Sequence, residues 1–313
     1  MKKFLLTFLL FLVGFFLADK LLIIVRNSAP DREVDKRMEQ LYQGKINSDI
    51  IILGSSRGAR DVIARQLSDS LKISAQNFSF PGSGVEFHDY LLSEILKNSK
   101  HKPKLLILNV DDPEELNTNS SRLNFRLDRF YPFVKYPQAL DELIKRGEKN
   151  YWLSNLFIVH QMSIDNFDLR KRHYKALDTV LQDGSMPISF TDPRFTGIFK
   201  DTLEYYEVKR ETETGLNSFL NIINQCKKNN IELVIISPPN YYKTIYGFRE
   251  RIVSLVNNNA HLYFHDNNLH NYSKEAKYYF DDVHLNKSGA ILFTSELVDY
   301  LRKEINLNDI QKK

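Results

Sequence analysis

Three short segments of the chain combine hydroxyl, imidazole and carboxylate side chains with glycine, in patterns that could support nucleophilic catalysis. They are residues 54–57 (GSSR), 77–84 (NFSFPGSG) and 281–286 (DDVHLN). Such groups can attack a carbonyl carbon through a serine hydroxyl, with a histidine as the base and a carboxylate that orients the histidine. Each segment alone also has an ordinary structural explanation, so only their combination is informative.

The first segment lies between an apolar run and an amphipathic one, which indicates a strand that passes through Gly54 into a helix. Ser55 or Ser56 would then lie at a helix N-terminus, where free N–H groups and the helix dipole favour an oxyanion. Serine is also a common helix cap, so this segment alone does not separate a nucleophile from a cap.

The other two segments suggest an oxyanion donor and a general base. Gly82 lies in a glycine-rich turn, where the backbone can approach a bound group and donate an N–H to it, although an ordinary tight turn has the same composition. Asp281 precedes His284 by three residues, so its carboxylate can hold the imidazole through Nδ1 while Nε2 faces a nucleophile. A solvated loop pair is the alternative for Asp281 and His284.

The elements that would position these segments alternate between apolar strands and amphipathic helices, as in parallel sheets with helical connections. The expected strands are residues 49–53, 74–80, 105–110, 231–237 and 261–265, and the expected helices are 57–71, 86–97, 216–228, 248–256 and 288–305. This pattern predicts an α/β fold. Ligands bind at the carboxyl edge of such sheets, which is where the three segments are expected.

The order of the three segments resembles the SGNH (GDSL-like) hydrolase superfamily, and Gly54-Ser55-Ser56 is similar to its membrane-anchored envelope members. The run 281–289 (DDVHLNKSG) is the most specific match. The resemblance implies a flavodoxin-like three-layer sandwich with a central parallel sheet. It also implies a triad of Ser56, His284 and Asp281, with an oxyanion hole formed by the N–H groups of Ser56 and Gly82. Ser55 and Arg57 would lie near the pocket.

One block departs from the family pattern. The family usually has G-x-N-D after the third strand, and this chain has residues 109–112 (NVDD), which places Asp111 where an asparagine is expected. An ionised carboxylate cannot donate a hydrogen bond to an oxyanion. Three explanations remain open: Asp111 is protonated, Asn109 or another group substitutes, or the oxyanion hole is smaller.

The N-terminus predicts a secretory signal or a membrane anchor. Residues 4–18 carry no charge, and the span 4–25 has about the length that crosses ~30 Å of hydrocarbon. Asp19 and Lys20 interrupt the run near one end, where a lysine can reach the interface. Phe16 lies three residues before a cut after Ala18, which argues against cleavage and favours an anchor. Basic residues flank the run on both sides, so the expected orientation, with the C-terminal part outside the cytoplasm, rests on analogy with signal anchors.

The expected organisation is an anchor at residues 1–25, a juxtamembrane linker at 26–46 and an α/β domain at 47–313. A helical insertion is expected at about 116–207, where strands and helices stop alternating and where the tryptophan of the chain, Trp152, is found. The insertion is either an accessory layer of the core or a cap that faces the substrate. If the insertion is a cap, its residues contribute to the choice of substrate in addition to the three motif segments.

These observations predict a membrane-anchored serine esterase or O-acyltransferase that acts on acyl groups of an envelope or exported glycan, without a cofactor or a metal. Its expected partners are the acylated glycan, the cytoplasmic membrane and possible envelope-assembly proteins. A non-catalytic glycan-binding or assembly subunit is the alternative. A third reading, metal-dependent phosphotransfer through Asp111 and Asp112, lacks a phosphate-binding loop with lysine.

Composition and residue spacing argue against several other kinds of function and site. A net charge of +4 without a basic cluster argues against nucleic-acid binding, and a single cysteine, Cys226, excludes an intramolecular disulfide. Another group, His261, His265, Asp266 and His270, straddles a strand and a loop, so a structural or solvated role is expected for it rather than metal binding. His88 follows the glycine block and is expected on a helix surface or, alternatively, in the pocket.

Overall fold

A computed structural model describes residues 1–110, 114–117, 124–173, 177, 179–198, 202–241, 243–266 and 269–311. The chain forms two compact units. The first comprises Met1–Gln43 and Arg126–Tyr174, and the second comprises Gly44–Phe125 and Lys175–Lys313. Asp111 and Asp112, for which the sequence suggested roles, lie outside the described residues.

The second unit is an α/β structure built on a five-stranded parallel sheet, which confirms the predicted class. The strands are β1 (Ile50–Leu53), β2 (Ala75–Asn77), β3 (Leu105–Asn109), β5 (Glu232–Ser237) and β7 (His261–Phe264). Their order is β2-β1-β3-β5-β7, and every neighbouring pair is parallel. All strands therefore end at the same edge of the sheet.

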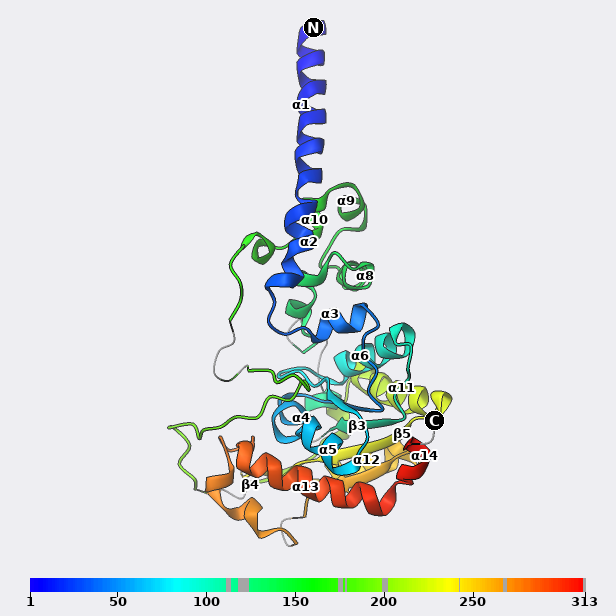
Figure 1. The fold of residues 1–313 in the computed structure, drawn as a ribbon, viewed down its shortest axis with the longest axis vertical. Coiled ribbons are helices and arrows are strands. Elements are labelled where there is room, and N and C mark those ends of the chain that lie inside the picture. Colours follow the sequence, from blue (N-terminus) through cyan, green and yellow to red (C-terminus); the bar gives the residue numbers. More distant parts are fainter. Residues whose placement is uncertain are drawn as a thin grey trace. The chain divides into compact units, whose positions relative to one another are not determined.

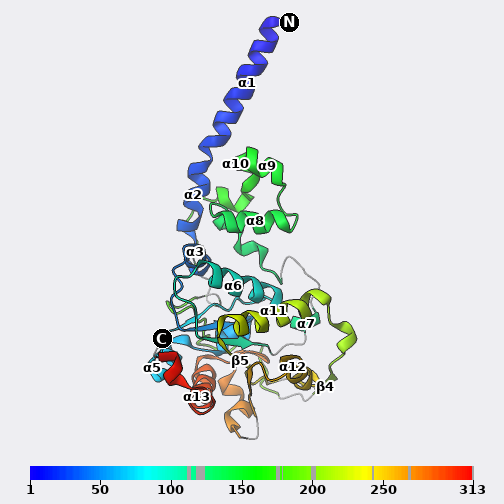
Figure 2. The ribbon, with the colours of Figure 1, turned by 90° about the vertical axis from the view of Figure 1, so that its right-hand side faces the viewer.

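Helices cover both faces of this sheet (Figure 2). Helices α6 (Val85–Asn98) and α11 (Glu213–Asn229) pack together on one face, and α5 (Ala64–Leu71) and α13 (Lys287–Glu304) pack together on the other. Residues 50–53 are all fully buried, because alternate side chains meet the two helical layers. This explains why β1 and β3 are continuous apolar runs.

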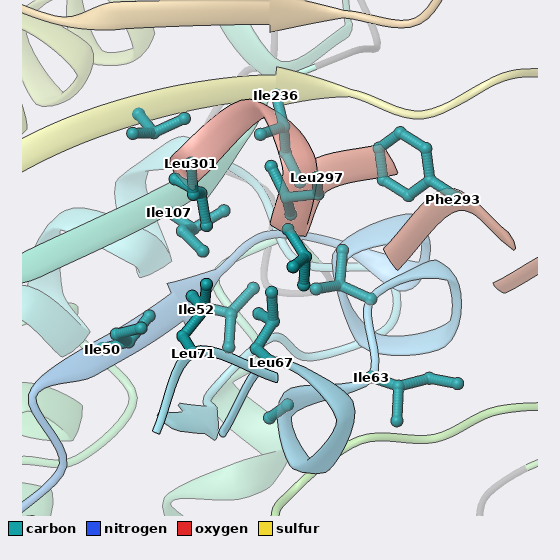
Figure 3. Close-up of a cluster of buried hydrophobic side chains, with 14 of the residues drawn as sticks. Ile50, Ile52, Ile63, Leu67, Leu71, Ile107, Ile236, Phe293, Leu297 and Leu301 are labelled. Carbon is teal, nitrogen blue, oxygen red and sulfur yellow. The ribbon is translucent and has the colours of Figure 1, made fainter. Parts of the chain in front are cut away.

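Figure 3 shows the core on the face covered by α5 and α13. Its labelled members include Ile50, Ile52, Ile107 and Ile236 from the strands, Leu67 and Leu71 from α5, and Phe293, Leu297 and Leu301 from α13. These side chains join α5, the helix that precedes β2, to α13 near the C-terminus. The two segments that carry the predicted nucleophile and base are attached to this core.

The predicted helix 57–71 is wrong in one respect, because it is two helices, α4 (Ser56–Asp61) and α5. Val62 and Ile63 are extended, with ψ angles of 119° and 101°. Asn77 Nδ2 donates to the carbonyl of Val62 at 3.0 Å, and the N–H of Ile63 donates to the hydroxyl of Thr294 at 3.1 Å. These tertiary hydrogen bonds replace the helical ones at the break.

Several further elements complete the second unit. They are α7 (Glu114–Asn117), α12 (Phe248–Val256), α14 (Leu307–Gln311) and a separate parallel pair of strands, β4 (Thr202–Tyr205) and β6 (Lys243–Tyr246). The sequence patterns did not predict the β4–β6 pair. The two strands lie far apart in the chain and read as loops, so only their tertiary pairing reveals them.

The first unit is helical. It contains α1 (Lys2–Leu21), α2 (Ile23–Arg32), α3 (Arg37–Tyr42), α8 (Pro137–Lys145), α9 (Tyr151–Leu156) and α10 (Ile158–Gln161). Helices α1 and α2 follow each other almost without a break and together form the 31-residue helical run Lys2–Arg32. Within the described residues, this is the one helical run that is long and apolar enough to cross a membrane, and little of it is buried by the rest of the protein. Figure 1 shows it as the long N-terminal helix.

Candidate active site

Ser56 is the first residue of α4, directly after the end of β1. Its Oγ lies 2.7 Å from Nε2 of His284, although the two residues are 228 positions apart in the chain. The N-cap residue of α4 is Ser55, whose side chain makes no capping hydrogen bond, and the hydroxyl of Ser56, the first helical residue, contacts the histidine. The structure therefore brings the expected nucleophile and base into hydrogen-bond contact.

Two glycines allow this close approach of strand and helix. A Cβ atom at Gly54 would lie 2.7 Å from Cβ of Asn109, and one at Gly58 would lie 2.7 Å from Oγ of Ser79. Both distances are shorter than van der Waals contact. The first turn of α4 can therefore pack against the ends of β3 and β2 only because these positions lack side chains.

His284 is held by Asp281. Nδ1 of the imidazole lies 2.9 Å from both carboxylate oxygens, and the same carboxylate accepts the backbone N–H groups of Val283 at 2.9 Å and His284 at 2.8 Å. Asp281 thus orients the ring and also stabilises the turn that carries it. The triad geometry of a serine hydrolase is complete in these three side chains.

The rest of the 281–289 run fixes this turn to the start of α13. Phe280 N–H donates to the carbonyl of His284 at 2.9 Å. The side chain of Asn286 caps α13 by accepting the N–H groups of Ser288 and Gly289, and it donates to the carbonyl of Lys277 at 2.7 Å. A Cβ at Gly289 would lie 2.3 Å from the carbonyl oxygen of Tyr278, so glycine is required there. Each polar or glycine position of the motif therefore has a structural reason.

Asp61 connects the turn of His284 to the helix that begins at Ser56. Its Oδ1 accepts the N–H of Leu285 at 3.0 Å, and its other oxygen lies 3.6 Å from Nε of Arg57. Burial raises the pKa of Asp61 to about 8, against the lowering effects of Arg57 and the Leu285 N–H. Sequence reasoning missed Asp61, because an aspartate inside a helix carries no motif signal.

The surroundings of His284 favour its neutral form. Burial lowers the pKa of His284, and Arg60 and Arg57 lower it further, while Asp281 opposes them. Burial raises the pKa of Asp281, but the hydrogen bond and charge of His284 and the two backbone N–H groups outweigh it and lower the pKa overall. At neutral pH the imidazole is neutral, so Nδ1 donates to the Asp281 carboxylate and Nε2 can accept the Ser56 proton.

The glycine turn is attached to the same strand end. Gly54 O accepts the N–H of Phe80 at 3.0 Å and lies 3.3 Å from the hydroxyl of Ser83. Gly82, between them, has a φ of 74°, which favours glycine. In the part of the chain that the structure describes, the N–H groups of Ser56 and Gly82 donate to no backbone carbonyl. Both are therefore candidate oxyanion donors.

A buried polar network supports this turn from inside. Ser83 Oγ lies 2.7 Å from the carbonyl oxygen of Phe80 and 2.8 Å from Nε2 of His88. Nδ1 of His88 lies 3.7 Å from Glu115. His88 is completely buried, so its expected place on a helix surface is wrong, and burial lowers its pKa to about 3. The neutral imidazole acts as a fixed hydrogen-bonding group.

The remaining candidate residues have mainly structural contacts. Asn77 bonds to backbone groups of Gly58, Val62 and Ser79. Asn109 is buried at the end of β3, with Nδ2 at 3.4 Å from the carbonyl of Ile236. Ser55 is half-buried beside the nucleophile, and the buried Arg57 donates to the carbonyl of Pro238. Asp111, the residue that departs from the family pattern, lies outside the described residues.

The described residues contain no cluster of three histidine, cysteine or acidic side chains that could hold a metal ion. His265 and His270 instead contact Glu296, at 2.9 and 3.3 Å. Cys226 is buried, which raises the pKa of its thiol to about 12. It packs as an apolar side chain and is unreactive at neutral pH.

No protein-family model matches the chain, and no curated protein matches it in sequence. The functional argument therefore depends on the geometry of Ser56, His284 and Asp281.

Proposed function

We propose that the protein is a membrane-anchored serine esterase or O-acyltransferase of SGNH type that acts on acyl groups of an envelope or exported glycan. The observation that carries the proposal is the contact of Ser56 Oγ with His284 Nε2 at 2.7 Å, together with Asp281 at 2.9 Å from Nδ1. This is the hydrogen-bond order of a catalytic triad, in which the carboxylate orients the histidine and the histidine takes the proton of the serine.

The strand order also supports the family. If only the five strands of this sheet are numbered, in the order in which they occur in the chain, the spatial order β2-β1-β3-β5-β7 becomes 2-1-3-4-5. This is the strand order of flavodoxin-like sandwiches. Ser56 follows the first strand and His284 precedes the last long helix, as the resemblance to SGNH hydrolases requires. The proposed site lies at the carboxyl end of the strands, where open α/β sheets bind their ligands.

In the proposed reaction, Ser56 Oγ attacks the ester carbonyl carbon while its proton passes to Nε2 of His284. The carbonyl electrons move to the oxygen, which accepts hydrogen bonds from the N–H groups of Ser56 and Gly82. Collapse of this intermediate breaks the ester bond, and the leaving alkoxide takes the proton from His284. The products of this half-reaction are an alcohol and an acyl-Ser56.

The second half-reaction repeats these steps in reverse. A hydroxyl group gives its proton to His284 and attacks the acyl carbon, and Ser56 leaves with that proton. Water as the attacking group releases a free acid, which makes the enzyme an esterase. A sugar hydroxyl forms a new ester, which makes it an O-acyltransferase. Asp281 stabilises the imidazolium in both halves.

The N-terminal helix suggests where the reaction takes place. Lys2–Arg32 is long and apolar enough to span the cytoplasmic membrane. With the N-terminus inside, the α/β unit would lie on the extracytoplasmic side, where acylated glycans are assembled and modified. The proposed substrate class follows from this location and from the resemblance to envelope members of the superfamily.

Mass spectrometry of envelope glycans from a strain with Ser56→Ala tests this function. Loss of an acyl-group mass from the glycan indicates a transferase, and accumulation of such groups indicates an esterase. His284→Ala should give the same change, because both variants remove the same reaction. Unchanged glycans in both strains would contradict the proposal and favour a non-catalytic glycan-binding or assembly subunit.

A further inference from the structure

Helices α9 and α10 of the first unit pack against the C-terminal end of α1. The ring of Phe157, between α9 and α10, lies 6.1 Å from the ring of Phe15 and 6.3 Å from that of Phe16. Lys20 donates to the carbonyl of Leu156. Figure 1 shows α10 beside the junction of α1 and α2. The α9–α10 segment therefore lies at the level of the last apolar turns of α1.

Asp19 explains how this contact is held. Its carboxylate is buried and accepts the N–H groups of Ile158 at 2.8 Å and Val159 at 2.9 Å, while Lys20 lies 3.4 Å away. These N–H groups belong to the first turn of α10, which has no helical acceptors for them. A charged residue in an apolar run is costly in lipid, but here its hydrogen bonds satisfy backbone groups that lipid cannot satisfy.

The outer surface of this segment is mainly apolar and aromatic. Its exposed hydrophobic members, here called the α9 surface, are Tyr151, Trp152, Leu153, Leu156 and Val159, and the same segment also exposes Asn155 and His160. Trp152 is the most exposed, at 73%. Phe157, which directly follows Leu156 in the chain, lines an apolar groove of about 370 Å³ together with residues 12, 13 and 15–17 of α1. The surface is thus continuous with the side chains of the candidate membrane span.

We propose that the α9 surface is embedded in the interfacial layer of the phospholipid bilayer that α1 crosses. Tryptophan and tyrosine favour this layer, because their rings combine an apolar body with a polar group. If the interface lies at Asp19 and Lys20, where the uncharged run 4–18 ends, Phe15 lies four residues, or about 6 Å of helix, inside it, which is within the depth at which interfacial helices are buried. The inference rests on the membrane anchoring in the proposed function but not on the catalytic chemistry.

Trp152 makes the proposal directly measurable, because it is the only tryptophan in the sequence. The full-length chain is reconstituted into phosphatidylcholine vesicles that contain lipids brominated either near the headgroup or near the chain end. We expect Trp152 emission to shift to the blue and to fall about twofold or more with the bromines near the headgroup, and less with the deeper bromines. Iodide in the buffer should quench it weakly.

Two matched probes calibrate this result, both in a Trp152→Phe background. Phe8→Trp places the indole within α1, where the deeper bromines should quench it more strongly. Tyr205→Trp places it on the α/β unit at a site that is 75% exposed, where iodide alone should quench it. Trp152 should fall between these two probes.

Three outcomes would overturn the proposal. If Trp152 is quenched like the Tyr205→Trp probe, by iodide alone, it lies in water. If neither the bromolipids nor iodide quench Trp152, it is covered by protein, such as a second copy of this chain, and not by lipid. A Phe8→Trp probe that no bromolipid quenches shows that α1 does not span the bilayer. Ester hydrolysis by the same vesicles is measured in parallel, so failure of the lipid contact is distinguished from failure of the catalytic proposal.

Discussion

The substitution Asp281→Asn tests the triad through a change of one functional group. The asparagine Oδ1 can still accept the backbone N–H groups of Val283 and His284, which hold the turn at 2.9 and 2.8 Å. Its NH₂ group then faces Nδ1 of His284 and can only donate to it. Because Oδ1 already accepts two backbone N–H groups, the NH₂ group at the Oδ2 position, 2.9 Å from Nδ1, favours the tautomer with its proton on Nε2. In that tautomer Nε2 can no longer accept the proton of Ser56.

The expected effects on rate and on stability therefore differ in size. In serine proteases with the same arrangement, the wrong tautomer of the catalytic histidine lowers kcat about 10⁴-fold, so we expect kcat to fall about 10³- to 10⁴-fold here. The turn keeps its backbone hydrogen bonds, and the Asp281 side chain is 30% exposed, so we expect the free energy of unfolding to change by less than about 1 kcal/mol. If Asp281 had only a structural role, the substitution would lower the free energy of unfolding substantially and would change kcat little in the protein that remains folded.

The assay is the initial rate of p-nitrophenyl acetate hydrolysis by the full-length protein, with thermal unfolding measured on the same samples. Asp282→Asn is the matched control, because it is the same substitution one residue away on an exposed side chain. It should leave both quantities unchanged. An Asp281→Asn protein that hydrolyses the ester nearly as fast as the wild type, or that loses activity only because it unfolds, would refute the triad.

Three further predictions concern pH and the oxyanion turn. The rate should fall as the pH decreases through the pKa of His284, which burial holds below 6.5, so the acid limb of a kcat/KM profile should lie below that value. Asp61→Asn should become more stable relative to the wild type as the pH rises from about 4 to about 8. The reason is that the fold raises the pKa of the Asp61 carboxyl from 3.8 to about 8 and so disfavours its charged form. Thermal unfolding at several pH values measures this difference in stability, and a difference that does not change with pH would contradict the prediction. Gly82→Ala should lower kcat by about 10²–10³ with little change in KM, because a side chain at a φ of 74° displaces the N–H donor; an unchanged kcat would remove Gly82 from the oxyanion hole.

The sequence was sufficient for the features that short-range patterns encode. The apolar runs of β1 and β3 indicated buried parallel strands, because both of their faces are covered. The run 281–289 was informative because its aspartate, asparagine and glycine each satisfy a local backbone requirement near His284. The order of these motifs then placed the nucleophile and the base at one edge of the sheet.

What the sequence did not reveal depends on contacts between distant segments. The break between α4 and α5 follows from hydrogen bonds to Asn77 and Thr294, which no local pattern records. His88 looked like a surface residue, because its burial depends on Ser83 and on a segment after β3. Asp19 looked like a cost to the membrane helix, but it caps a helix that begins 139 residues later.

Labelling with a fluorophosphonate probe tests the central claim most directly, because the probe forms a bond to an activated serine and releases fluoride. After incubation of the full-length protein, mass spectrometry of its peptides locates the label. We predict modification of wild-type protein at Ser56, none at this position in Ser56→Ala, and a rate slowed by about 10³ or more in His284→Ala. Wild-type protein that is not labelled, or that is labelled to the same extent as Ser56→Ala, would contradict the account.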